Sequence, residues 1–137
     1  MVELIVTHLP RLFLFVCASA FLYYGSLGLV NPAATVFPLG ITVDSAAATT
    51  EIRATYGGLL IGIGLFLFYA GYAENKVGLV SFVLMISAIG LTRLYGIYSD
   101  GSNSTIQWTL LTMEVVPAAI ALALLARYYV LPNGGAD

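Results

Sequence analysis

The chain has 137 residues, of which 60% are hydrophobic and only 9% are charged, and its mean hydropathy is +0.95. Soluble domains average about 45 to 50% apolar and about 25% charged residues, so this composition excludes an ordinary soluble domain. The formal net charge of -2 argues against nucleic acid as a partner, because nucleic-acid binding requires a basic surface.

Four long apolar stretches follow one another along the chain. They are residues 12–30, 54–73, 77–99 and 105–126. A helix needs roughly 20 residues to cross a hydrocarbon core of about 30 Å, and each stretch has about this length. The sequence therefore predicts an all-α fold: an integral membrane four-helix bundle that forms a single transmembrane domain over residues 1–137.

The connection between the first two stretches, residues 31–53, is much longer than the other two connections. Asn31-Pro32 is typical of an N-cap followed by the first residue of a helix, which predicts a short helix that ends at Val36 or Phe37. Asp44 or Ser45 can cap another turn over residues 46–48. Because loops of this length are often functional, we expect a partly helical lid between the first and second helices.

Basic residues near the helix ends give an orientation. An even number of spans places both termini on one side of the membrane. Arg11, Lys76 and Arg127 belong to that side, and Arg53 and Arg93 belong to the other. Lys and Arg are enriched in cytoplasmic loops, so this distribution predicts that both termini are cytoplasmic.

Two ionisable side chains, Arg93 and Glu114, lie inside the third and fourth apolar stretches. Arg93 is about 9 Å from the end of its stretch, and Glu114 is about 14 Å from the start of the next, at 1.5 Å per residue. An unpaired charge at such depth costs several kcal/mol, so we expect the two side chains to form an ion pair. We expect Glu51, Arg53 and Tyr56, at the start of the second helix, in the same polar network.

This network has two interpretations that the sequence leaves open. It is either a structural ion pair that fixes the register of the helices or a site for a ligand. We predict no catalytic residue, because the sequence contains no nucleophile with a neighbouring base and no phosphate-binding or dinucleotide-binding motif. We also expect no cofactor and no metal ion, since His8 and Cys17 have no partners at ligand spacing.

Five glycines of the second apolar stretch lie on two faces of the expected helix. The first set, which shares a face with Arg53, is Gly57, Gly64 and Gly71, and the second set is the GxxxG pair Gly58 and Gly62 on the opposite face. Small residues allow close contact between helices in lipid. We therefore expect the first face to lie toward the polar site and its neighbouring helices, and the second to contact a helix of this chain or of a partner.

Residues 51–58, Glu-Ile-Arg-Ala-Thr-Tyr-Gly-Gly, resemble the Glu-Ile-Arg-Ala-x-Tyr-Gly-Gly signature of an uncharacterised bacterial family of small four-helix membrane proteins. The likeness extends over nearly the whole chain and includes the Asn-Pro lid, Arg93 with Gly96, and Glu114. The chain is also broadly similar to DoxX-type four-helix membrane proteins. The resemblance implies the fold, the site and a bacterial inner membrane, but no activity, because the family is a domain of unknown function.

We expect a non-enzymatic membrane protein, and two hypotheses for its role remain open. In the first, it is an accessory or scaffold subunit that packs against other membrane chains or a second copy of itself. In the second, it binds a small amphiphile or an anionic lipid headgroup at Arg53, Arg93 and Glu114. A small multidrug transporter is less favoured, because such proteins carry their essential glutamate in the first span, which has no charge here.

Overall fold

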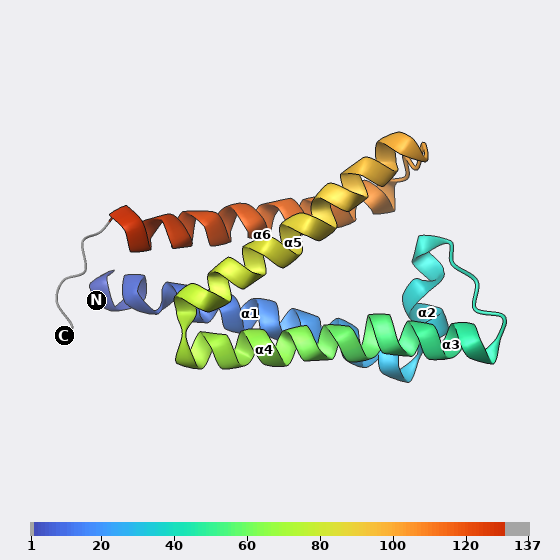
Figure 1. The fold of residues 1–137 in the computed structure, drawn as a ribbon, viewed down its shortest axis with the longest axis horizontal. Helices are drawn as coiled ribbons and strands as arrows, with labels where there is room; N and C mark the ends of the chain where they lie inside the picture. The colour runs from blue at the N-terminus through green and yellow to red at the C-terminus, as the bar shows by residue number, and fades with distance from the viewer. Residues whose placement is uncertain (1, 131–137) are drawn as a thin grey trace. The chain divides into compact units, whose positions relative to one another are not determined.

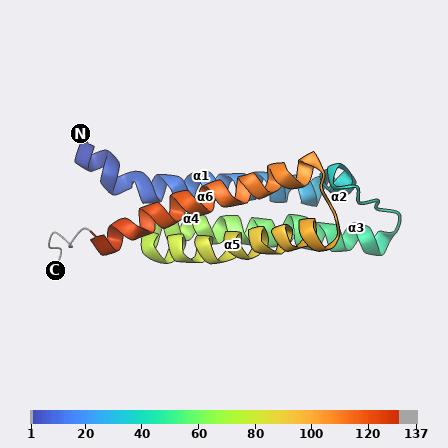
Figure 2. The ribbon, with the colours of Figure 1, turned by 90° about the horizontal axis from the view of Figure 1, so that it is seen from above.

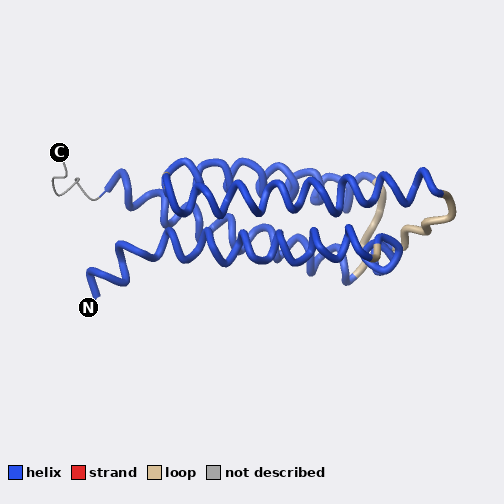
Figure 3. The backbone as a smooth tube through the Cα atoms, turned by 90° about the horizontal axis from the view of Figure 1, so that it is seen from below, coloured by secondary structure: helices blue, strands red, loops and turns tan. Residues whose placement is uncertain are grey.

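The computed structural model describes residues 2–130, and all regular secondary structure in this range is helical (Figures 1 and 3). Among these described residues, four helices are long and apolar enough to cross a membrane, namely His8–Val30, Ala46–Ala73, Asn75–Ser99 and Thr105–Tyr128. The predicted all-α class is therefore confirmed, and a membrane-spanning helical bundle fits these elements.

The chain divides into two compact units, residues 1–11 with 74–137 and residues 12–73. The first unit contains the hairpin of α5 (Asn75–Ser99) and α6 (Thr105–Val130). The second contains most of α1 (Val2–Val30), then α2 (Pro32–Val36), η1 (Phe37–Leu39), α3 (Ala46–Ile52), η2 (Arg53–Leu59) and α4 (Leu60–Ala73). That both units form one domain stays a prediction.

In the second unit, α1 and the segment η2–α4 lie side by side and run in opposite directions (Figure 1). Glycines from both helices allow the backbones to approach. A Cβ added at Gly28 would collide with the carbonyl group of Tyr56, and one added at Gly57 would lie 3.0 Å from the backbone nitrogen of Leu29. Gly28 therefore requires glycine for this contact, and a side chain at Gly57 would need Leu29 to shift by a few tenths of an ångström.

The same contact continues along α4. A Cβ at Gly64 would lie 3.0 Å from the carbonyl oxygen of Ala18, and one at Gly71 would lie 2.9 Å from the ring of Phe15. Phe15 in turn stacks on Phe68, with ring centroids 4.7 Å apart. We call this row the glycine seam; it consists of Gly25, Gly28, Gly57, Gly64 and Gly71. The Gly57 face thus lies against α1. That the same face looks onto the polar site stays a prediction.

The lid begins as the sequence predicts. The side-chain oxygen of Asn31 accepts a hydrogen bond from the amide of Ala34 at 3.2 Å, Pro32 is the first residue of α2, and α2 ends at Val36. The short 3-10 helix η1 follows and ends at Gly40, whose φ of 76° is a conformation that favours glycine. The predicted partly helical connection is therefore confirmed.

The end of the lid differs from the prediction in one respect. The turn over residues 46–48, which Asp44 or Ser45 was expected to cap, continues into the second long helix, so that this helix begins at Ala46. Ser45 is its N-cap and accepts a hydrogen bond from the amide of Ala48 at 3.1 Å. From there α3 continues without interruption through the π-helical segment η2 into α4. Residues 46–53 thus belong to the helix, since alanine favours helix and no proline follows that could break it.

Three other helix ends also lie outside the predicted stretches. α1 begins at Val2 instead of Leu12 and includes Pro10, and α6 continues past Ala126 to Val130. α5 begins at Asn75, two residues ahead of the predicted Val77. The apolar stretch measures only the part of a helix that suits hydrocarbon, whereas the helix itself continues into the interface, where water and headgroups satisfy its ends.

Candidate functional site

α5 and α6 form an antiparallel hairpin in which they lie side by side (Figure 2). α5 ends at Ser99 and α6 begins at Thr105, as the sequence predicts. The loop turns through Gly101, whose φ is 66°, and the indole nitrogen of Trp108 donates a hydrogen bond to the side chain of Asn103 at 2.6 Å. Residues at similar distances from this short loop therefore face each other across the hairpin.

Arg93 and Glu114 are such a pair, and the ion pair expected between them is present. Nη2 of Arg93 lies 2.7 Å from Oε1 of Glu114, and Nε lies 2.9 Å from Oε1 and 3.0 Å from Oε2. The two side chains are 21% and 9% exposed. Contacts from two guanidinium nitrogens to one carboxylate give such a pair a fixed orientation as well as strength.

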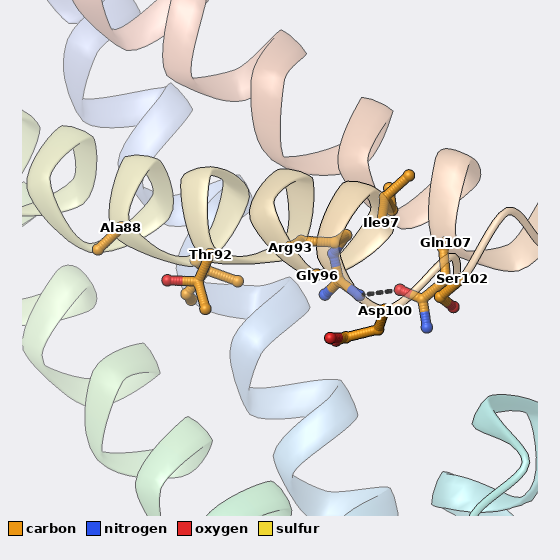
Figure 4. A pocket seen from close by; sticks show the side chains of 9 residues that line it. Ala88, Thr92, Arg93, Gly96, Ile97, Asp100, Ser102 and Gln107 are labelled. Carbon is orange, nitrogen blue, oxygen red and sulfur yellow. Dashed lines mark hydrogen bonds between the residues drawn. The ribbon is translucent and has the colours of Figure 1, made fainter.

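Gln107 is the third member of this cluster. Its Oε1 accepts a hydrogen bond from Nη1 of Arg93 at 2.8 Å (Figure 4). Gln107 precedes Glu114 by seven residues, so the two share a face of α6, and this spacing is the signal by which a sequence can find it. All three guanidinium nitrogens thus have a partner on α6. The contact uses the side-chain oxygen of Gln107, so its amide N–H groups do not take part in it.

Gly90 lies against the side chain of Glu114. A Cβ added at Gly90 would lie 3.6 Å from Oε2 of Glu114 and 4.0 Å from Leu111. Because Gly90 is three residues before Arg93, both residues lie on the face of α5 that meets Glu114. This contact was not predicted from the sequence, although a glycine one turn from an intramembrane arginine is a usable signal.

A pocket of about 530 Å³ lies beside the ion pair, along α5 and the loop that follows (Figure 4). Its polar lining comes from Arg93, Asp100, Ser102 and Gln107 at the loop end, and Ala88, Ile89 and Thr92 line it farther along α5. The lining thus changes from polar at the helix end to mainly apolar within the span. Asp100, Ser102 and Thr92 were missed because nothing in a sequence distinguishes a residue beside a pocket from one in lipid or water.

The polar groups of this hairpin suit an organic ligand better than a metal ion. The carboxylate of Glu114 is already bonded to Arg93, which leaves Asp100 as the one acidic residue that lines the pocket. Hard cations such as Mg²⁺ or Ca²⁺ need several oxygen ligands. Among the residues that the structure describes, groups of three or more His, Cys, Asp or Glu able to hold a metal ion are absent.

Glu51, Arg53 and Tyr56 lie in the second unit, so their membership of one network with the ion pair of α5 and α6 stays a prediction. Within that unit, Nε of Arg53 donates a hydrogen bond to the carbonyl of Leu29 at 3.2 Å. This carbonyl belongs to the last turn of α1, where backbone acceptors lack partners within the helix. Arg53 therefore caps α1, and Tyr56 contributes its backbone to the glycine seam.

Gly58 and Gly62 show a different environment from the glycine seam. A Cβ at Gly62 would meet nothing within 4 Å among the described residues, and one at Gly58 would meet only the carbonyl of Arg53, in the same helix, at 3.9 Å. Within the second unit this face thus has no helix against it. Its contact with a partner chain stays a prediction.

Comparison with known protein families gives a match over most of the chain. The model of a family described as a domain of unknown function (DUF4345) matches residues 9–125. None of the curated proteins and none of the solved structures matches the chain. The matched range includes the ion pair, Gln107 and every residue that lines the pocket.

Proposed function

The chain belongs to the DUF4345 family, a domain of unknown function, and we propose that it is a non-enzymatic membrane protein that binds a small amphiphile in the pocket of the α5–α6 hairpin. The pocket itself is the observation that carries this proposal. An ion pair that only fixes helix register needs no cavity beside it, and close packing would be the better solution in a structural element.

The size and lining of the pocket support an amphiphile as its ligand. Ligand pockets in proteins usually measure about 300 to 1,000 Å³, with an apolar lining and a few polar groups that fix orientation. At about 530 Å³ this pocket lies within that range. Its polar end is at the end of α5, near the membrane interface, and its apolar end is deeper in the span, which is the orientation of an amphiphile in a bilayer.

A pair of exposed neighbours on α5 allows a test of this function. Thr92 lines the pocket, whereas Leu91, which is 67% exposed, does not. Thr92→Phe should fill the pocket and abolish binding, and Leu91→Phe adds bulk to the same helix outside it. Native mass spectrometry of protein purified in mild detergent should show a retained amphiphile in the wild type and in Leu91→Phe but not in Thr92→Phe. Equal retention by all three proteins would refute the proposal.

The accessory or scaffold role is the second candidate, and the open face of Gly58 and Gly62 favours it. Small residues offer no advantage where a helix meets only fluid lipid, but they permit close contact with another helix. Gly62→Leu should therefore lower the oligomeric state or the detergent stability, measured by light scattering and thermal unfolding. Leu59→Phe, at a position that is 59% exposed, is the matched control and should change neither. If Gly62→Leu leaves both the oligomeric state and the detergent stability unchanged, this role loses its main support.

The cellular setting belongs to the same proposal. We propose a bacterial inner membrane with both termini in the cytoplasm, supported by the four spans and by the basic residues Arg11, Lys76 and Arg127. We further propose that residues 51–58 are the signature of the family. Their support is structural: this segment contains the arginine that caps α1 and the backbone that meets Gly28. The looser likeness to DoxX-type proteins concerns architecture alone.

A further inference from the structure

We infer that the pocket of the α5–α6 hairpin selects an amphiphile whose head is a protonated amine and that the carboxylate of Asp100 binds this amine. The inference rests on the proposed function, because it names the ligand class of the same pocket. It differs from the anionic headgroup that two arginines in the sequence indicate.

The positive charge that an anionic ligand would need is already neutralised. Arg93 directs Nε and Nη2 to the carboxylate of Glu114 and Nη1 to Gln107. The side chain of Glu114 is only 9% exposed, so a phosphate or carboxylate in the pocket would compete with a buried and fully oriented acid. The pair together presents no net charge to the ligand, and separating it would strand a buried charge.

Asp100 then decides the sign of the charge in the pocket. It is exposed, lines the pocket and accepts a hydrogen bond from the hydroxyl of Ser99 at 2.9 Å. Among the described residues of the first unit, no basic side chain forms an ion pair with it. The last turn of α5 contains no basic residue. The one lysine of the sequence, Lys76, is at the other end of α5, about 36 Å from Asp100 at 1.5 Å per residue.

The helix dipoles do not reverse this result. The C-terminal end of α5 carries partial negative charge, and the N-terminal end of α6, at the same end of the hairpin, carries partial positive charge. The two contributions oppose each other, so the full charge of the Asp100 carboxylate dominates. Ser102 and the amide of Gln107, which line the same end, supply neutral polar groups for the remainder of the head.

The position of Asp100 also sets the direction of the ligand. With the amine at Asp100, an alkyl chain would pass along Thr92, Ile89 and Ala88, toward the middle of α5. Thr92 is about 12 Å from Asp100 along the helix axis, a distance that a short alkyl chain spans. A free alkylamine and the amine of phosphatidylethanolamine both have this chemistry, and the experiment distinguishes them.

Three probes that share one alkyl chain test whether the pocket selects an amine: dodecylamine, dodecanol and dodecanoate. Each is used at a concentration well below that at which it forms micelles. Equilibrium binding to the full-length protein in mild detergent should show a Kd for dodecylamine at least about tenfold lower than for dodecanol, the effect of one favourable charge pair near an interface. Dodecanoate should bind more weakly than dodecanol.

Variants of Asp100 test whether the preference for the amine depends on this carboxylate. Asp100→Asn keeps the shape of the side chain and should remove the preference for dodecylamine, whereas Asp100→Glu should retain it. Asp44→Asn removes another exposed acid, in the second unit, and should leave the preference unchanged. A preference that persists in Asp100→Asn, or a tighter binding of dodecanoate than of dodecylamine, would overturn the inference.

A second experiment, with lipids, identifies the source of the amine. The protein is reconstituted in nanodiscs of phosphatidylethanolamine and phosphatidylglycerol, and native mass spectrometry then measures which lipids stay bound to the protein released from them. Retained phosphatidylethanolamine that is lost in Asp100→Asn supports the phospholipid, and dodecylamine binding without it supports a single-chain amine. If dodecylamine and dodecanol bind equally and both are lost in Thr92→Phe, amine selection fails while amphiphile binding stands. If no probe binds in a Thr92-dependent manner, both fail.

Discussion

Arg93 and Glu114 depend on each other, because either charge alone would be costly within a membrane-spanning helix. Their pairing could be predicted from the sequence, since a short loop of known position places residues of equal depth opposite each other. The hydrogen bond from Arg93 to Gln107 and the contact of Gly90 with Glu114 required the structure. Periodicity places Gln107 on the correct face of α6 but does not show which partner its amide will contact.

The first prediction concerns the free energy of this pair. Glu114→Ala removes the carboxylate and leaves the guanidinium of Arg93 partly buried, so it should destabilise the protein by about 3 kcal/mol. The double variant Arg93→Ala, Glu114→Ala removes both charges and should be less destabilised than the single one. Thermal unfolding in detergent measures both. A single variant that unfolds at a higher temperature than the double variant would contradict this account.

The glycine seam shows what can and cannot be derived for a whole element. Helical periodicity groups Gly57, Gly64 and Gly71 on one face of their helix, and in the structure this face packs on α1. The π-helical segment Arg53–Leu59 was not predicted, because it widens the helical turn without any proline to mark it. The closest backbone approach, between Gly28 and Tyr56, falls within this segment.

The second prediction tests whether close approach explains these glycines. Gly28→Ala introduces a Cβ that would collide with the carbonyl of Tyr56, so α1 and η2 must separate, at a cost of about 1 to 3 kcal/mol. Gly90→Ala makes the same chemical change in α5, where the added Cβ would meet its nearest neighbours at ordinary contact distances of 3.6 to 4.0 Å, and it should not lower the unfolding temperature. Thermal unfolding of both variants in the same detergent is the measurement. Equal stability of the two variants would show that the seam tolerates a methyl group.

At the scale of the whole molecule, the sequence is informative about the membrane and less so about helix ends. The four spans follow from hydropathy because the bilayer requires about 20 apolar residues in each. The sequence predicts a helix cap at Asp44 or Ser45 but not that the capped turn joins the second long helix, because a helix that leaves the hydrocarbon loses its apolar pattern while keeping its hydrogen bonds. From Ala46 to Ala73 this helix has 28 residues, and Arg53 lies about 30 Å from its far end, near the expected boundary of the hydrocarbon.

The third prediction concerns orientation, which rests on few charges. No charged residue is present between Arg11 and Asp44, so the basic residues near the helix ends carry the topological information. They predict that the lid and the α5–α6 loop are outside the cytoplasm. In a Cys17→Ala background, Ile41→Cys in the lid and Ser102→Cys in the loop should therefore react with a membrane-impermeant maleimide in intact cells.

The matched control for this labelling lies at the other side of the membrane. Glu74 is exposed in the connection between α4 and α5, so Glu74→Cys should react only after the cells are lysed. Position 41 serves better than position 40, because a cysteine at Gly40 would need the left-handed backbone conformation that glycine has there. Labelling of Glu74→Cys in intact cells, with protection of positions 41 and 102 until lysis, would reverse the topology. The pocket and Asp100 would then face the cytoplasm, where the amine-bearing ligand would have to originate.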